Sequence, residues 1–121
     1  YLDDWNAARR EHAAAYSEAF ANTNVHFPIS SSNSEPVWHL YVIQVNNRDA
    51  VREYLQQQHI STGIHYPIPI HMQESYRFLG YDEGSFPLTE SAAGRMISLP
   101  MYAELSRQQI EHVAGTITQF Q

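Results

Sequence analysis

The chain has 121 residues, a hydrophobic content of 43%, a formal net charge of -6 and no cysteine. This length suits one domain with a proper core. The negative charge argues against a nucleic-acid partner, because phosphate binding needs clustered basic residues. Disulfides and cysteine-ligated metals are excluded. No apolar run reaches membrane-spanning length and no signal peptide is visible, so we expect a cytoplasmic protein with no membrane partner.

The first half of the chain predicts a helix, a loop, a strand and a second helix. Residues 1–20 have an amphipathic pattern in which five side chains fall near one face: Trp5, Ala8, Tyr16, Ala19 and Phe20. Residues 22–36 read as a surface loop with a short extended piece at 25–28. Residues 37–45 alternate with apolar groups on both faces, which predicts a central strand covered on each side. Residues 48–59 then predict an amphipathic helix behind the cap candidates Asn46 and Asn47.

The second half continues with short elements. Residues 60–66 predict a strand in which Gly63 allows a bulge or a close backbone approach. Residues 72–79 predict a short helix stopped by Gly80, which tolerates a positive φ. Another helix begins at Phe86-Pro87, with a capping residue and small side chains over 89–95.

A short strand at 96–99 should end at Pro100, after which Ser106 and Gln109 form the capping box of the last helix. The buried stripe of that helix is expected to comprise Ile110, Val113, Ile117 and Phe120, with Ala114 alongside. The elements together predict an α+β fold, a small mostly antiparallel sheet packed with helices.

One segment concentrates chemistry-bearing residues. Gly63-Ile-His-Tyr-Pro-Ile-Pro-Ile-His71 holds two prolines, which remove backbone donors and stiffen the chain. We therefore expect His65, Tyr66 and His71 to keep a fixed relation to each other. A rigid polar and aromatic rim at a strand end is a common place for ligand contacts.

This segment, together with Ser98-Leu-Pro-Met-Tyr102 and the opening Leu2-Asp-Asp-Trp-Asn-Ala-Ala-Arg-Arg10, resembles the C-terminal part of the DegT/DnrJ/EryC1/StrS sugar aminotransferases. The resemblance runs from about Leu2 to Phe120. It implies a fold like the small domain of fold-type I aminotransferases that depend on pyridoxal phosphate (PLP). Such enzymes aminate keto-sugars on nucleotide carriers, in making cell-surface polysaccharides or antibiotics, with glutamate or glutamine as amino donor.

The resemblance also implies a domain organisation. Residues 1–121 would be a single domain, in which the helix at 1–20 continues from a missing N-terminal PLP-binding domain and residues 37–121 form the small-domain core. The alternative is an ordinary first helix. Family members are homodimers, which makes a homodimer the expectation for the full-length parent. The surplus of aromatic residues would cover the missing domain and would make the chain self-associate when it is alone.

The chain contains no lysine: its seven basic residues are all arginine. PLP is normally held as a Schiff base on a lysine amine, which no side chain here can supply. The family's cofactor-anchoring lysine and aspartate belong to the N-terminal domain. We therefore expect no catalytic, cofactor-binding or metal residue on this chain. We also expect no PLP on the chain alone, and no activity from it.

By the same resemblance, the His-Tyr-Pro…His segment reaches towards the cleft that holds the sugar nucleotide. This implies that His65, Tyr66 and His71 are substrate-binding residues that contact sugar or phosphate oxygens without transferring the proton. A zinc site from His65, His71 and Glu74 has no usual ligand spacing and is disfavoured.

Three alternatives remain open. Arg77 and Arg95 could contact a phosphate, although solvated surface positions suit them better. The chain could be a stand-alone binding or interaction module that kept the fold and lost the chemistry. It could also be an unrelated ligand-binding α+β domain, which would make the motif match accidental.

Overall fold

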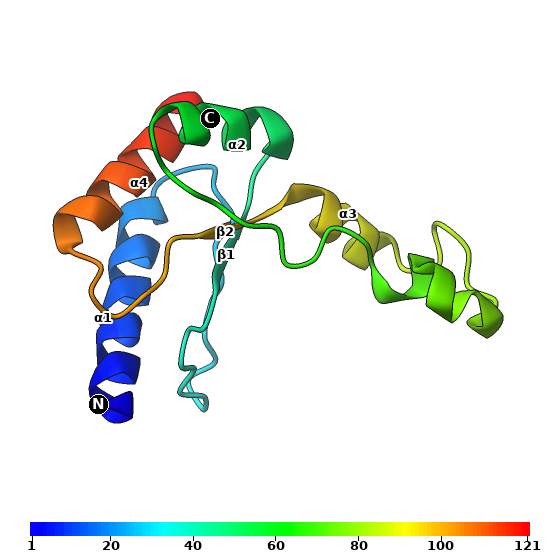
Figure 1. The fold of residues 1–121 in the computed structure, drawn as a ribbon, viewed down its shortest axis with the longest axis horizontal. Coiled ribbons are helices and arrows are strands. Elements are labelled where there is room, and N and C mark those ends of the chain that lie inside the picture. The colour runs from blue at the N-terminus through cyan, green and yellow to red at the C-terminus, as the bar shows by residue number, and fades with distance from the viewer.

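The computed structural model describes residues 1–121 and contains helices around a small sheet (Figure 1). In chain order the elements are α1 (Leu2–Phe20), β1 (Tyr41–Gln44), α2 (Arg48–Gln57), the 3₁₀ helices η1 (Ile70–Met72) and η2 (Glu74–Leu79), α3 (Pro87–Arg95), β2 (Met96–Leu99) and α4 (Arg107–Phe120). This confirms the predicted α+β class. None of the helices combines the length and apolar composition that crossing a membrane requires.

The two strands pair antiparallel at the centre of the fold. Ile43 of β1 lies opposite Ile97 of β2, and both side chains are fully buried. Each strand also has a single-residue partner on its outer edge: Gln44 pairs with His26, and Ser98 pairs with Gly63. Both strands are therefore interior, although the sheet consists of little more than one ladder.

The predicted strand at 37–45 is too long. The backbone of Trp38 has a φ of 51°, in the left-handed region, which interrupts an extended chain. The strand begins only at Tyr41, and its burial alternates between buried and half-buried positions. The expectation that both faces are covered therefore holds for one face only.

The predicted strand at 60–66 is also wrong, because only Gly63 pairs with a neighbour. The chain then leaves the sheet at Pro67 and Pro69, neither of which has a backbone N–H for a ladder. The predicted helix at 72–79 is replaced by η1 and η2. Gly80 does stop the second of them, with a φ of 71°.

The core joins the helices to one face of the sheet. Tyr16 and Phe20 of α1 are fully buried, as are Ile110 and Ile117 of α4, and α1 packs against α4. Two members of the predicted apolar faces lie outside: Trp5 is 48% exposed, and Phe120 is 40% exposed and contacts the ring of Tyr54. Ala19 is exposed as well. The sequence pattern thus identified the buried face of α4 except for Phe120, whereas in α1 it found Tyr16 and Phe20 and missed the buried Ala13 and Ala15.

Residues 64–90, which we call the arm, extend away from α1, α2 and α4 (Figure 1). The arm contains η1, η2 and the first turn of α3. Ten of its large hydrophobic side chains are exposed: Tyr66, Ile68, Ile70, Met72, Tyr76, Phe78, Leu79, Tyr81, Phe86 and Leu88. An apolar surface of this density marks an interaction site.

Candidate functional site

The base of the arm is fixed by a contact between His65 and β2. Nδ1 of His65 lies 2.8 Å from the hydroxyl oxygen of Ser98, a buried residue whose backbone pairs with Gly63. The His65 ring lies directly over Gly63, where a Cβ would come within 2.5 Å of the ring carbon Cε1. The expected close approach at Gly63 is therefore confirmed, and a side chain is what approaches.

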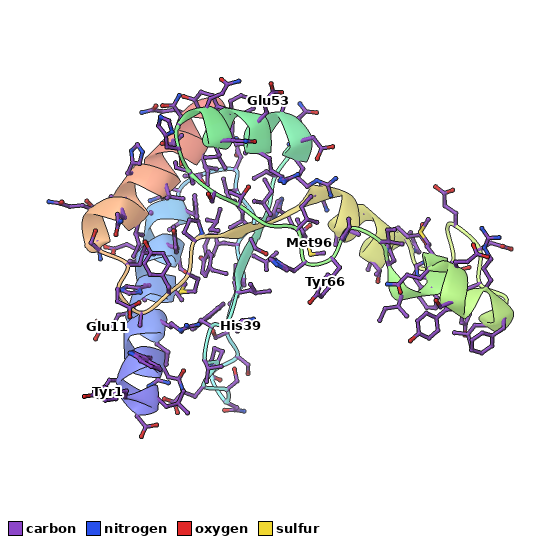
Figure 2. The ribbon with its side chains drawn as sticks, in the orientation of Figure 1. Tyr1, Glu11, His39, Glu53, Tyr66 and Met96 are labelled. Carbon is purple, nitrogen blue, oxygen red and sulfur yellow. The ribbon has the colours of Figure 1, made fainter.

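Tyr66 lies at the base of the arm, next to the sheet (Figure 2), and 73% of its surface is exposed. Its ring meets the His65 ring edge-on, with the ring centres 5.6 Å apart. The phenol makes no hydrogen bond within the chain. His65 and Tyr66 therefore form a contiguous pair, one member held by β2 and the other open to a ligand.

His71 lies in a different environment. It is buried, with 8% of its side chain exposed, and its Nε2 lies 2.9 Å from Oε1 of Glu90 in α3. The ring of Phe86 packs edge-on against the His71 ring, with the ring centres 4.8 Å apart. The structure thus brings His65 and Tyr66 together and holds His71 through a separate element.

Glu90 receives three hydrogen bonds. Besides His71, the backbone N–H of Phe86 donates to Oε1 at 3.0 Å and the N–H of Gly84 donates to Oε2 at 2.8 Å. The backbone donors Phe86 and Gly84, and then His71, hold the pKa of the Glu90 carboxyl below its ordinary value. The N-cap residue of α3 is Phe86 and no side chain caps the helix, so the capping residue expected within 89–95 is not found; Glu90 instead accepts from the N–H of Phe86.

A shallow groove of about 390 Å³ opens beside His71. Its other lining residues are Met72, Arg77, Gly80, Tyr81, Asp82 and Glu83. Arg77 is exposed and paired with Glu74 at 3.0 Å, and Arg95 donates to Ser91 within its own helix. The two arginines weighed as phosphate ligands are thus engaged locally and share no site.

The disfavoured zinc ligands are not gathered either. His65 bonds Ser98, His71 bonds Glu90, and Glu74 pairs with Arg77. The structure contains no group of three or more histidine, aspartate or glutamate residues placed to hold a metal ion.

Sequence reasoning missed Ser98 and Glu90 as partners of the two histidines. Each of these two residues has only a weak signal in the amino-acid sequence. Ser98 is the one polar residue in the strand Met96–Leu99, and Glu90 is an acid in the first turn of a helix that begins with proline. Neither signal indicates which histidine it serves.

The chain does not fit PLP by itself. Without lysine it has no side-chain amine to bond the aldehyde carbon of the cofactor. Its two buried polar atoms that lack a hydrogen-bond partner, His12 Nδ1 and Arg52 Nε, lie on α1 and α2, outside the arm. These residues give no basis for a cofactor step within this chain.

Known proteins match this chain over nearly its whole length. The family model "DegT/DnrJ/EryC1/StrS aminotransferase family" matches residues 1–118. The dTDP-3-amino-3,6-dideoxy-alpha-D-galactopyranose transaminase of Aneurinibacillus thermoaerophilus is 40% identical over 120 residues, which are 99% of this chain and 32% of that protein. The chain therefore spans about a third of the length of this relative.

Solved structures agree with the fold. DesV of S. venezuelae, in complex with a ketimine intermediate, matches with a TM-score of 0.91 and 34% identity over 98% of this chain and 32% of its own. The putative sugar aminotransferase Spr1654 of Streptococcus pneumoniae, solved in a PLP-form, matches with a TM-score of 0.83 and 22% identity over 95% of this chain and 31% of its own.

The chain matches the C-terminal region of these proteins. This match excludes the alternative of an unrelated α+β domain that shares the three motifs by accident. The resemblance inferred from three short motifs is confirmed over nearly the entire chain. The chain belongs to the DegT/DnrJ/EryC1/StrS aminotransferase family, a family of PLP-dependent sugar aminotransferases.

Proposed function

We propose that the chain is the C-terminal part of a PLP-dependent aminotransferase that aminates a keto-sugar carried on a nucleotide. The observation that carries this is the 40% identity, over nearly the whole chain, to one third of a dTDP-sugar transaminase. The remaining part would lie N-terminal, supply the lysine and bind the cofactor. The complete enzyme would be a cytoplasmic homodimer, and α1 would continue from the preceding domain.

In this enzyme PLP supplies the electron sink and the amino-group carrier. The residues of this chain bind and orient the sugar nucleotide. The Tyr66 phenol is exposed and can both donate to and accept from a sugar or phosphate oxygen. With Nδ1 of His65 engaged by Ser98, its Nε2 is the atom left for the ligand.

His71 would contact the substrate from the groove side of its ring, while Glu90 holds the other side. The three residues act by hydrogen bonding, and proton transfer belongs to the lysine of the missing part. Exclusion of water would come from the apolar arm, whose ten exposed side chains are proposed to pack against the PLP-binding portion.

A chimeric enzyme tests the proposal. This chain would replace the corresponding C-terminal third of the Aneurinibacillus thermoaerophilus transaminase, and the product would be assayed for transamination of its dTDP-sugar. We expect an active chimera, and we expect Tyr66→Phe to raise KM by about fivefold, because one hydrogen bond contributes about 1 kcal/mol. Val37→Ala, at an exposed position outside the arm, is the matched control.

A soluble, dimeric chimera that binds PLP but does not turn over would contradict the proposal. It would favour the second candidate, a stand-alone interaction module that kept the family fold. That candidate also predicts that a separately produced N-terminal part of the relative gains no activity from this chain.

The isolated chain provides a second test. After incubation with PLP and reduction by borohydride, we expect no mass adduct beyond the N-terminal amine, because the chain has no lysine. A stoichiometric complex with a shifted absorption spectrum would show that the chain forms a cofactor site alone and would contradict its role as a part.

A further inference from the structure

We propose that Glu90 is a positioning residue that fixes the orientation and the proton of His71, so that His71 presents an unprotonated Nδ1 and accepts a hydrogen bond from a hydroxyl group of the sugar. This inference rests on the proposed function, because it takes His71 as a substrate contact. It adds which ring atom faces the ligand and which ligand group that atom selects.

The geometry of Glu90 makes it a fixed anchor. Its two oxygens are held by the N–H groups of Gly84 and Phe86 at 2.8 and 3.0 Å, and only 17% of its side chain is exposed. Because both backbone donors come from the turn before α3, the carboxylate cannot rotate without losing them. His71 in η1 is thereby tied to the start of α3, 19 residues further along the chain.

The charge of Glu90 decides where the proton of His71 lies. The hydrogen bonds from Phe86, Gly84 and His71 keep the Glu90 pKa low, so the carboxyl is ionised at neutral pH. An ionised carboxylate only accepts hydrogen bonds. Nε2 of His71 must therefore donate, and in the neutral imidazole Nδ1 then carries the lone pair.

Nδ1 of His71 is left for a ligand. It makes no hydrogen bond within the chain, and it is absent from the buried polar atoms that lack a partner, which are His12 Nδ1 and Arg52 Nε. His71 lines the groove beside η1, and we take Nδ1 as the ring nitrogen that faces it. A lone pair there suits a hydroxyl donor and does not suit a phosphate oxygen.

Nuclear magnetic resonance of the ring nitrogens of His71 tests this on the 121-residue chain itself. At a pH of about 8, where an ordinary histidine is neutral, we expect the form with a proton on Nε2 and none on Nδ1. Glu90→Ala removes the carboxylate that accepts from Nε2, so the spectrum should shift towards the Nδ1-protonated form. Glu83→Ala removes a carboxylate that lines the same groove and makes no hydrogen bond to His71, and it should leave the spectrum unchanged.

The wild-type spectrum alone can overturn the proposal. Either a proton on Nδ1 or a doubly protonated ring would do so, whether or not the variants fold. An unchanged His71 spectrum in Glu90→Ala, with unshifted core amides such as Ile97 and Ile117, would also overturn it.

Failure of the proposed function would give a different combination of results from failure of the positioning role. In the active chimera, Glu90→Ala should raise KM for the dTDP-sugar by about tenfold with little change in kcat, since His71 loses the group that orients its acceptor nitrogen. If the chimera is inactive while His71 shows the expected proton position, the positioning role stands and the enzymatic role fails.

Discussion

At the scale of single residues, the absence of a side chain at Gly63 decides where the His65 ring lies. Gly63 leaves room for the His65 ring, and Ser98 then holds that ring from β2. Residue 63 lies in the edge bridge to the sheet, so the position of His65 is fixed relative to the core. The candidate site therefore begins at the edge of the sheet.

Gly63→Ala should destabilise the chain by about 1–3 kcal/mol, the usual cost of adding a methyl group to an occupied space. The new Cβ would meet the His65 ring, which would have to leave Ser98. Urea unfolding measures the effect.

Gly115→Ala is the matched control. It lies within α4 with nothing within 4 Å of its added Cβ, and it should stabilise the chain by about 0.5–1 kcal/mol through helix propensity and chain entropy. Equal effects from the two substitutions would mean that the His65 ring does not occupy the space over Gly63.

At the scale of elements, the ends of helices are specified locally. The hydroxyl of Ser106 accepts from the N–H of Gln109 at 3.2 Å, and the Gln109 amide oxygen accepts from the N–H of Ser106 at 2.9 Å. Arg107 in the next position bonds Glu18 of α1 at 2.9 Å. One turn of sequence thus both starts α4 and aligns it with α1.

Removal of the capping hydroxyl by Ser106→Ala should lower the free energy of unfolding by about 1 kcal/mol. Gln108→Ala, an exposed neighbour in the same turn, should change it by less than about 0.5 kcal/mol. Thermal and urea unfolding of the two variants would check this. A loss of similar size in both variants would assign the effect to the turn in general and not to the cap.

At the scale of the whole molecule, two buried phenols connect distant segments. The Tyr16 hydroxyl donates to the carbonyl of Pro100 at 3.1 Å, and the Tyr41 hydroxyl bonds Ser17 at 2.9 Å. Burial raises the pKa of Tyr16 and of Tyr41 above the ordinary value of 10.0. Both phenols must therefore stay neutral for α1 to pack on the sheet.

These raised pKa values predict a loss of stability in alkali. Because the folded-state values lie above the unfolded-state value, the contribution is complete below pH 10.0 and is lost as the pH rises through the folded-state values. In a spectrophotometric titration, two of the eight tyrosines should ionise late, together with unfolding. Ionisation of Tyr16 and Tyr41 near pH 10 without unfolding would contradict the prediction.

We predict that the arm makes the isolated chain self-associate. Phe78 and Leu88 are 79% and 86% exposed, and the double substitution Phe78→Ser with Leu88→Ser should shift sedimentation towards the monomer. Ile29→Ser removes a side chain that is 88% exposed but lies outside the arm, and it should change nothing. If the wild type sediments as a monomer at all concentrations, the apolar arm is not sufficient for association.

By itself the sequence determined the features that depend on a few neighbouring residues. Four features follow from local signals: the helix predicted at 48–59 and found at 48–57, the strand at 96–99 with its stop at Pro100, the helix stop at Gly80 and the capping box of Ser106. The family, too, was readable from three short motifs.

Only the tertiary structure decided how far the strands extend and which groups hold the candidate site. Trp38 adopts a left-handed backbone that no local pattern indicates, and His65 and His71 meet partners 33 and 19 residues away. Local propensity acts over about one helical turn, whereas these partners depend on the path of the arm. The sequence alone therefore specified the residue types of the site, and the path of the chain through space assigned each histidine its partner.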